Sequence, residues 1–231
     1  MEGKLITHSI LQCKHMFKLD PDKTISDAAL KQLCLSGTDG IIVGGSSGVT
    51  FDNTASLLTR IRQYASLPCA LEISNRDAVV PTFDYFFIPM VLNTTQIEWL
   101  IGQQLEAIKD YGQYIDWNTV IPEGYIILNE QSTAAQLTGA LTDLSEHEIL
   151  AYVTLIDQMM KLPICYIEYS GTYGDMTLLQ RIAAQISHSK LFYGGGINSS
   201  EKANQARQFA DTIVVGNVIY EDLQAALATV Q

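Results

Sequence analysis

Basic side chains are scarce in this chain of 231 residues, which carries 14 Lys and Arg against 25 Asp and Glu, for a net charge of −11. Nonspecific binding to nucleic acid or to an anionic membrane surface requires clustered Lys and Arg, so both kinds of partner are disfavoured. The acidic residues are spread thinly and form no block. Any anionic ligand must therefore be held locally, by a small number of side chains and backbone N–H groups.

Cysteine and long apolar runs are also scarce. No CxxC pair occurs, so neither a zinc site nor a disulfide framework is indicated by the four cysteines, Cys13, Cys34, Cys69 and Cys165. Polar residues interrupt the first 15 positions, which leaves no stretch long enough for a signal peptide, and no run reaches transmembrane length. We expect a cytoplasmic protein without a membrane span, with its thiols reduced.

The chain also lacks any segment with the composition of a linker between domains. The chain has only six prolines, and no Pro/Gly/Ser-rich tract, charge block or low-complexity segment divides it. With 47% hydrophobic residues it can bury a sizeable core. A single domain over residues 1–231 is therefore favoured.

What the sequence does contain is an alternation of short apolar runs and helical segments. Runs rich in β-branched and aromatic residues predict eight strands, at 16–20, 40–45, 69–74, 85–93, 124–129, 165–171, 190–197 and 212–220. Helical spacing occurs between most of them and after the last, at 26–35, 53–64, 95–111, 145–161, 176–187, 199–209 and 221–230. Eight such units indicate an α/β fold of the TIM (β/α)8 barrel type. A doubly wound sheet is the alternative, but such sheets usually have fewer strands.

One connection is too short for a full crossover helix. Only ten residues, NRDAVVPTFD, separate Ser74 from Tyr85, and Pro81 would interrupt a helix there. We therefore expect a truncated third crossover helix, which would leave a gap in the outer ring.

Polar residues and glycines concentrate at the C-terminal ends of the expected strands, where barrel active sites lie. Lys18 and Asp20 end the first strand and point to the same side, although they could simply pair with each other. Glycines end the second and seventh strands, at 44–48 and 194–197, and the eighth strand carries a glycine and an asparagine at 216–217. Glycines after strands seven and eight, before helix starts, are typical of phosphate sites in TIM barrels, although a glycine run can be only a tight turn.

A glutamate stands inside the apolar, aromatic run CYIEYSG at 165–171. An ionised carboxylate is costly to bury unless it is paired or hydrogen-bonded. Glu168 could face water on an edge strand. Because side chains alternate along a strand, however, Glu168 projects to the same side as Tyr166 and Ser170, which places all three toward the barrel mouth. Its partner there would be Lys18 or a ligand hydroxyl, which a carboxylate can orient and deprotonate.

Five motifs in order resemble the geranylgeranylglyceryl phosphate synthase superfamily, and most closely its bacterial heptaprenylglyceryl phosphate synthase group. They are FKLD at 17–20, GGSSGVT at 44–50, YIEYSGTYGD at 166–175, LFYGGGI at 191–197 and ADTIVVGNVIYED at 210–222. The match covers about residues 14–230 and leaves residues 1–13 outside it as an N-terminal extension. The resemblance implies a TIM barrel that transfers a polyprenyl group from its diphosphate, heptaprenyl in the bacterial group, to the 3-hydroxyl of sn-glycerol 1-phosphate. It also implies release of diphosphate, formation of an ether lipid precursor, Mg²⁺ as cofactor and a homodimer.

Carried over position by position, the resemblance assigns roles to single residues. It implies that Lys18 contacts the glycerol phosphate, that Asp20 and Ser46 hold magnesium, and that Glu168 is the catalytic base. The implied glycerol 1-phosphate pocket comprises Tyr166, Ile167, Glu168, Tyr169, Ser170, Gly171, Gly196, Gly216 and Asn217.

The prenyl chain should need an apolar groove, which we expect beside the gap left by the short third crossover and along the helix at 95–111. Ala107 on this helix aligns with a position expected to be large in shorter-chain archaeal relatives and small in bacterial ones, although it could be an ordinary alanine packed on the barrel. Two other functions remain open: a TIM-barrel isomerase or aldolase acting on a phosphorylated sugar, and a non-catalytic barrel that binds a phosphorylated ligand.

Overall fold

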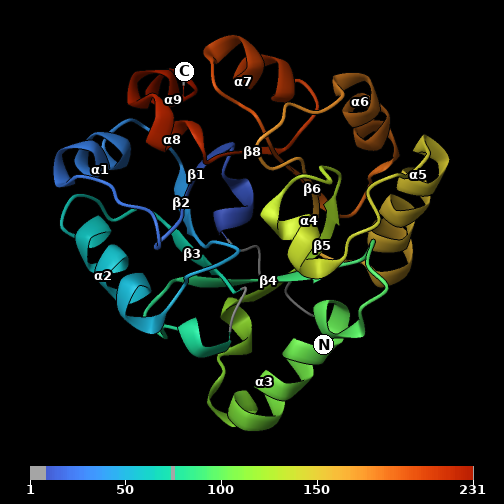
Figure 1. The fold of residues 1–231 in the computed structure, drawn as a ribbon, viewed down its shortest axis with the longest axis horizontal. Coiled ribbons are helices and arrows are strands. Elements are labelled where there is room, and N and C mark those ends of the chain that lie inside the picture. Colours follow the sequence, from blue (N-terminus) through green and yellow to red (C-terminus); the bar gives the residue numbers. More distant parts are fainter. Residues whose placement is uncertain (1–8, 74–75, 231) are drawn as a thin grey trace, which may run out of the picture.

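Eight parallel strands close into a barrel surrounded by helices (Figure 1) in the computed structural model, which describes residues 9–73 and 76–230. Each strand pairs with its sequence neighbours, and β1 closes the ring against β8. The strands are β1 (His15–Leu19), β2 (Gly40–Val43), β3 (Cys69–Glu72), β4 (Tyr85–Val91), β5 (Val120–Ile127), β6 (Ile164–Glu168), β7 (Lys190–Gly194) and β8 (Thr212–Val215). The predicted TIM barrel is confirmed, and the doubly wound alternative is excluded because such a sheet is open.

The helices begin at polar caps, as their sequences dictate. The side chains of Ser26, Thr50 and Ser145 accept hydrogen bonds from the first turns of α1, α2 and α5. The helices are α1 (Asp27–Cys34), α2 (Phe51–Arg62), α3 (Gln103–Tyr111), α4 (Thr133–Thr138), α5 (Glu146–Thr154), α6 (Met176–Gln185), α7 (Ser200–Ala206), α8 (Val218–Glu221) and α9 (Leu223–Ala228). None of the helices in the described residues is both long enough and apolar enough to cross a membrane.

Two expected helices are less regular than their periodicity suggests. The segment at 95–111 starts with a π-helical turn, Glu98–Gly102, before α3, and the segment at 145–161 ends in another, Leu155–Met160, after α5. The sequence did not predict α4, which has only six residues and lies after β5.

The third crossover is truncated as predicted. Between β3 and β4 the described residues contain only a 3-10 turn, Arg76–Ala78. The outward face of β4 therefore stays half-exposed at Phe86, Ile88 and Met90, whereas β2, β3, β6 and β8 are buried throughout. Figure 1 shows α3 outside β4, at the margin of the ring.

The hydrophobic core has two layers, one between the barrel and the helices and one inside the barrel. The inner layer includes Met16, Phe87, Tyr166 and Phe192. Ile10, which lies in the 3-10 turn Ser9–Gln12, is fully buried in this layer. The described part of the expected N-terminal extension is therefore packed into the barrel, and residues 1–8 lie outside the described residues.

Candidate active site

The ammonium of Lys18 lies in the barrel mouth and not beside Asp20. Lys18 Nζ donates to Glu72 Oε1 at 2.6 Å and lies 3.5 Å from Tyr125 Oη. Burial opposes the charge of Lys18, but the attraction of Glu72, Glu168 and Glu123 outweighs it, so the pKa of Lys18 is raised above its usual value. The Lys18–Asp20 ion pair, which the sequence left open, is replaced by a pair across the barrel from β1 to β3.

Both oxygens of the Glu168 carboxylate are held by donors. Tyr125 Oη donates to Oε2 at 2.9 Å, and the Ser170 N–H donates to Oε1 at 2.6 Å. Glu168 is only 4% exposed, so these bonds supply the partners that a buried carboxylate requires. The prediction that Lys18 would pair with Glu168 is wrong, because Lys18 bonds Glu72 instead. Lys18 interacts with Glu168 only through the attraction of their charges.

Tyr166 and Glu168 face the barrel interior together, as their parity predicted. A Cβ on Gly194 of the neighbouring strand would lie 2.5 Å from Tyr166 Oη and 3.1 Å from Glu168 Oε2, so β7 needs glycine at this position. The Tyr166 ring stacks on Tyr125 with a centroid separation of 4.6 Å. The two tyrosines therefore form an aromatic wall beside the carboxylate.

The rest of the segment 166–171 does not all point into the mouth. Ile167 packs in the outer core layer, so its side chain is directed away from any ligand in the barrel, and only its backbone is placed to contact one. Tyr169 also packs toward the helices, with its ring centroid 6.3 Å from that of Tyr193. Ser170 contributes the N–H that holds Glu168. Gly171 lies next to Asn217, whose Nδ2 would be 3.8 Å from a Cβ at position 171.

The glycine loop after β7 is shaped by close packing. Gly195 and Gly196 have φ values of +139° and +58°, and a Cβ on Gly196 would lie 2.2 Å from the Tyr173 backbone nitrogen. The N–H groups of these two glycines donate no hydrogen bond within the described residues, so they are available to an anion. Lys202 Nζ lies 3.4 Å from the Gly196 carbonyl oxygen, which brings a cation to the same loop.

The turn after β8 has more room. A Cβ on Gly216 would lie 3.7 Å from the Lys18 carbonyl oxygen, which is ordinary van der Waals contact. Gly216 has the same parity as Val214, which faces the barrel interior. Asn217 Oδ1 accepts a hydrogen bond from Lys23 Nζ at 3.4 Å. Lys23 and Lys202 were both missed by sequence reasoning, and they place a cation beside each glycine turn.

The turn after β2 brings Gly45, the residue before Ser46, against the Asp20 carboxylate. A Cβ on Gly45 would lie 2.5 Å from Asp20 Oδ1. Burial raises the pKa of Asp20, while the hydrogen bond from the Asp22 N–H opposes this rise. Within the described residues, no cluster of three or more His, Cys, Asp or Glu could hold a metal by itself. Mg²⁺ usually takes one or two carboxylates and completes its shell with water and phosphate oxygens, so Asp20 and Ser46 fit a magnesium shared with a diphosphate.

Three buried residues of the barrel interior, Glu72, Glu123 and Tyr125, were not among the predicted site residues. Glu72 ends β3 in an apolar run, as Glu168 ends β6, so the same reasoning could have found it. Glu123 lies one residue before the expected start of its strand at 124, whereas β5 begins at Val120. Tyr125 follows at the same parity and reaches both Lys18 and Glu168.

Ala107 lies on the side of α3 that faces the barrel. It is half-buried, and Gln104, one turn earlier, donates from Nε2 to the Pro89 carbonyl oxygen of β4 at 3.1 Å. The neighbouring Leu105 and Ile108 are exposed. Ala107 therefore belongs to the face of α3 turned to β4, whose outward side lacks a crossover helix.

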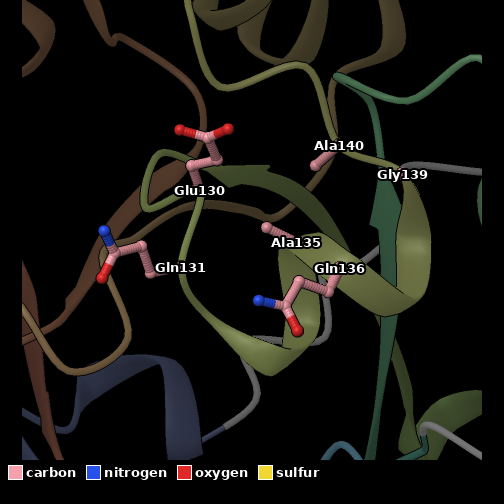
Figure 2. A pocket seen from close by; sticks show the side chains of 6 residues that line it. All are labelled: Glu130, Gln131, Ala135, Gln136, Gly139 and Ala140. Atoms are coloured by element: carbon pink, nitrogen blue, oxygen red, sulfur yellow. The ribbon is translucent and has the colours of Figure 1, made fainter.

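A pocket of about 440 Å³ lies over the loop after β5 and around α4 (Figure 2). Figure 2 shows that its lining comes from two adjoining segments, with Glu130 and Gln131 in the loop and Ala135, Gln136, Gly139 and Ala140 in and after α4. No Lys or Arg lines the pocket, so it is a poor phosphate site compared with the glycine turns.

The fold is a TIM barrel whose interior holds a buried carboxylate with donors on both oxygens, near the glycine turns after β7 and β8. Residues 8–231 match the model of the PcrB family, and the chain belongs to this family. The family model thus includes residues 8–13, which the motifs alone left outside.

Named relatives agree with this membership. The chain is 51% identical over 218 residues to a heptaprenylglyceryl phosphate synthase of Bacillus cereus (strain AH187), covering 94% of this chain and 95% of the relative. It is 50% identical over 224 residues to a heptaprenylglyceryl phosphate synthase of Bacillus cytotoxicus, covering 97% of each. A similar fold occurs in (S)-3-O-geranylgeranylglyceryl phosphate synthase from Thermoplasma acidophilum, solved with its substrate sn-glycerol-1-phosphate, with a TM-score of 0.81, 22% identity and coverage of 94% and 93% of the two chains.

Proposed function

We propose that this chain is a prenyltransferase that joins heptaprenyl diphosphate to the 3-hydroxyl of sn-glycerol 1-phosphate. The glycerol oxygen attacks the allylic C1, the bond from C1 to the diphosphate breaks, and the hydroxyl proton passes to Glu168. The products are diphosphate and an ether lipid precursor. The observation that carries the proposal is the buried Glu168 carboxylate, oriented at both oxygens in the mouth beside two glycine turns.

We expect the acceptor substrate to bind between these groups. The free N–H groups of the turn after β7 and the turn at Gly216 and Asn217 would receive the phosphate, with Lys18, Lys23 and Lys202 supplying positive charge. The glycerol hydroxyl would then reach Glu168. Holding both ends of a small acceptor lowers the entropy cost of bringing its hydroxyl to the donor carbon.

Turnover tests the reaction and separates its rivals. We expect the purified protein to release diphosphate only when a long-chain prenyl diphosphate and glycerol 1-phosphate are both supplied. A sugar-phosphate isomerase or aldolase would turn over without the prenyl donor, and a non-catalytic barrel would bind glycerol 1-phosphate without turnover. Either of these results would overturn the proposal.

Magnesium is the cofactor in this proposal, held by Asp20 and Ser46 together with the diphosphate oxygens. When bound, it would neutralise charge that develops on the leaving diphosphate. The Asp20 carboxylate is the charged protein ligand of this set, so its charge should set the affinity for the ion.

Asp20→Asn is therefore expected to raise the magnesium concentration required for half-maximal activity by about tenfold or more, a loss of about 1.4 kcal/mol. The amide keeps the shape of the side chain and removes its charge. Titrating activity with MgCl₂ measures the effect, and Asp143→Asn, at an exposed loop residue, is the matched control. An unchanged magnesium requirement in folded Asp20→Asn protein would remove Asp20 from the metal site.

Gly216→Val is expected to raise the KM for glycerol 1-phosphate by about tenfold, because the new side chain enters the mouth where the backbone has room for it. Gly196→Val is the contrasting variant. Its side chain meets the Tyr173 backbone, so it should lower the unfolding temperature and is no clean test of phosphate binding. Steady-state kinetics with thermal unfolding of both variants checks this. A folded Gly216→Val protein with wild-type KM would place the phosphate elsewhere.

We further propose a cytoplasmic homodimer. The four cysteines are buried and unpaired, which suits a reducing compartment. A second copy would shelter the exposed apolar side chains that gather on the segment around α3, namely Ile97, Ile101, Leu105, Ile108, Tyr111, Tyr114 and Trp117.

A further inference from the structure

Three buried carboxyl groups and the Lys18 ammonium lie close enough in the barrel interior for their charges to interact. Glu72, Glu123 and Glu168 are 6%, 0% and 4% exposed. Within the described residues, Lys18 is the cation whose charge acts on all three. If all three carboxyls were ionised, the dry interior would carry two uncompensated negative charges, which is costly in protein and would repel an incoming phosphate.

The hydrogen bonds decide which carboxyl is neutral. Glu168 has donors on both oxygens, and Glu72 has the Lys18 ammonium on Oε1. Neither oxygen of Glu123 has a partner within the described residues. An ionised carboxylate gains most from donors, so the carboxyl without any is the one that keeps its proton. Burial, followed by the nearby Glu72, raises the pKa of Glu123 well above its usual value, in agreement with this assignment.

Glu72 then has a specific role. Lys18 also lies near Tyr125, which bonds Glu168, so a lysine released from Glu72 has a second carboxylate within reach. An ion pair between Lys18 and Glu168 would occupy the base and remove the cation from the phosphate. The 2.6 Å bond from Lys18 to Glu72 prevents this pairing, so that Glu168 can act as the base while Lys18 contacts the phosphate.

We propose that Glu72 is a positioning residue that holds Lys18 away from Glu168. Glu123 is a permanently protonated carboxylic acid, and because it carries no charge it does not compete with Glu72 for the Lys18 ammonium. The role of Glu72 rests on the proposed function, because it concerns glycerol phosphate binding and the base. The protonation of Glu123 does not, since it follows from the buried contacts of the protein without ligand.

Infrared difference spectroscopy on the purified protein tests Glu123 without any substrate. At neutral pH we expect the wild type to show the carbonyl band of a protonated carboxyl that is lost in Glu123→Gln and retained in Glu72→Gln. If Glu123→Gln does not fold, the spectrum of the wild type is compared with that of Glu123→Met instead, because methionine has a similar length and no carboxyl group. No difference between wild type and the Glu123 variants in this band would overturn the assignment.

Kinetics tests Glu72 separately. Glu72→Gln is expected to raise the KM for glycerol 1-phosphate about tenfold and to lower kcat as well, because Lys18 leaves the phosphate and pairs with the base. Glu72→Asp restores the charge and should recover part of both losses, which a purely structural role would not predict. Wild-type kinetics in folded Glu72→Gln protein, or no recovery in Glu72→Asp, would overturn the positioning role. Absence of turnover in the wild type would instead count against the proposed function, and would leave the infrared result unaffected.

Discussion

Glu168→Gln is expected to lower kcat by about 10²–10⁴-fold, the usual contribution of a positioned acid or base. The amide oxygen can still accept the Ser170 N–H bond, and the Tyr125 hydroxyl can rotate to accept from the amide nitrogen. The variant therefore keeps the architecture of the mouth but has no group that takes up the glycerol proton. Binding of the prenyl diphosphate should change little, because Glu168 ends β6 whereas Asp20 follows β1.

Single-turnover kinetics and diphosphate binding, measured on the same variant, separate the two effects. Glu130→Gln is a matched control, since it neutralises a carboxylate in the loop after β5 that takes no part in the proposed site. If Glu168→Gln abolished the magnesium requirement while Asp20→Asn did not, the roles of the two carboxylates would be exchanged. Wild-type kcat in folded Glu168→Gln protein would exclude Glu168 as the base.

The strands and the direction of Glu168 were predictable because they depend on local rules. A strand buried on both faces reads as a continuous apolar run, and side chains alternate along it whatever it packs against. Parity therefore placed Tyr166 and Glu168 together correctly. The expected runs at 165–171, 190–197 and 212–220 extended past the strand ends, because the turns that follow continue their apolar and glycine-rich character.

The partners of the charged residues were not predictable in the same way. Lys18 and Glu72 are 54 positions apart, and they meet only because the barrel closes with a particular stagger between β1 and β3. Alternation says that Lys18 and Asp20 share a side, but not that the lysine turns inward to Glu72 while Asp20 lies against Gly45. The buried Glu123 was hidden for another reason, since a proline and a glycine beside it suggest a turn rather than a buried strand.

The largest change in specificity is expected at Ala107. The outward face of β4 is apolar and half-exposed where the third crossover helix is truncated, and the Gln104 side of α3 is turned toward it. Burying a methylene contributes about 0.8 kcal/mol, so each isoprene unit laid along such a surface gains several kcal/mol. A small residue at position 107 leaves this path open, and a large one would close it. We therefore predict that the wild type prefers heptaprenyl over geranylgeranyl diphosphate.

Ala107→Trp should reverse this preference, because the indole would block the groove before the end of the longer chain is buried. Lys109→Trp is the matched control: residue 109 lies on the same helix, its side chain is 69% exposed and it is not among the apolar residues of the proposed dimer, so a tryptophan there should leave the selectivity unchanged. Competition between the two donors, scored as the ratio of kcat/KM values, measures the effect. A wild-type preference for geranylgeranyl diphosphate would show that the groove is not the path of the chain. Unaltered selectivity in folded Ala107→Trp protein would show that Ala107 only packs on the barrel, and either result would leave the chemistry at Glu168 untouched.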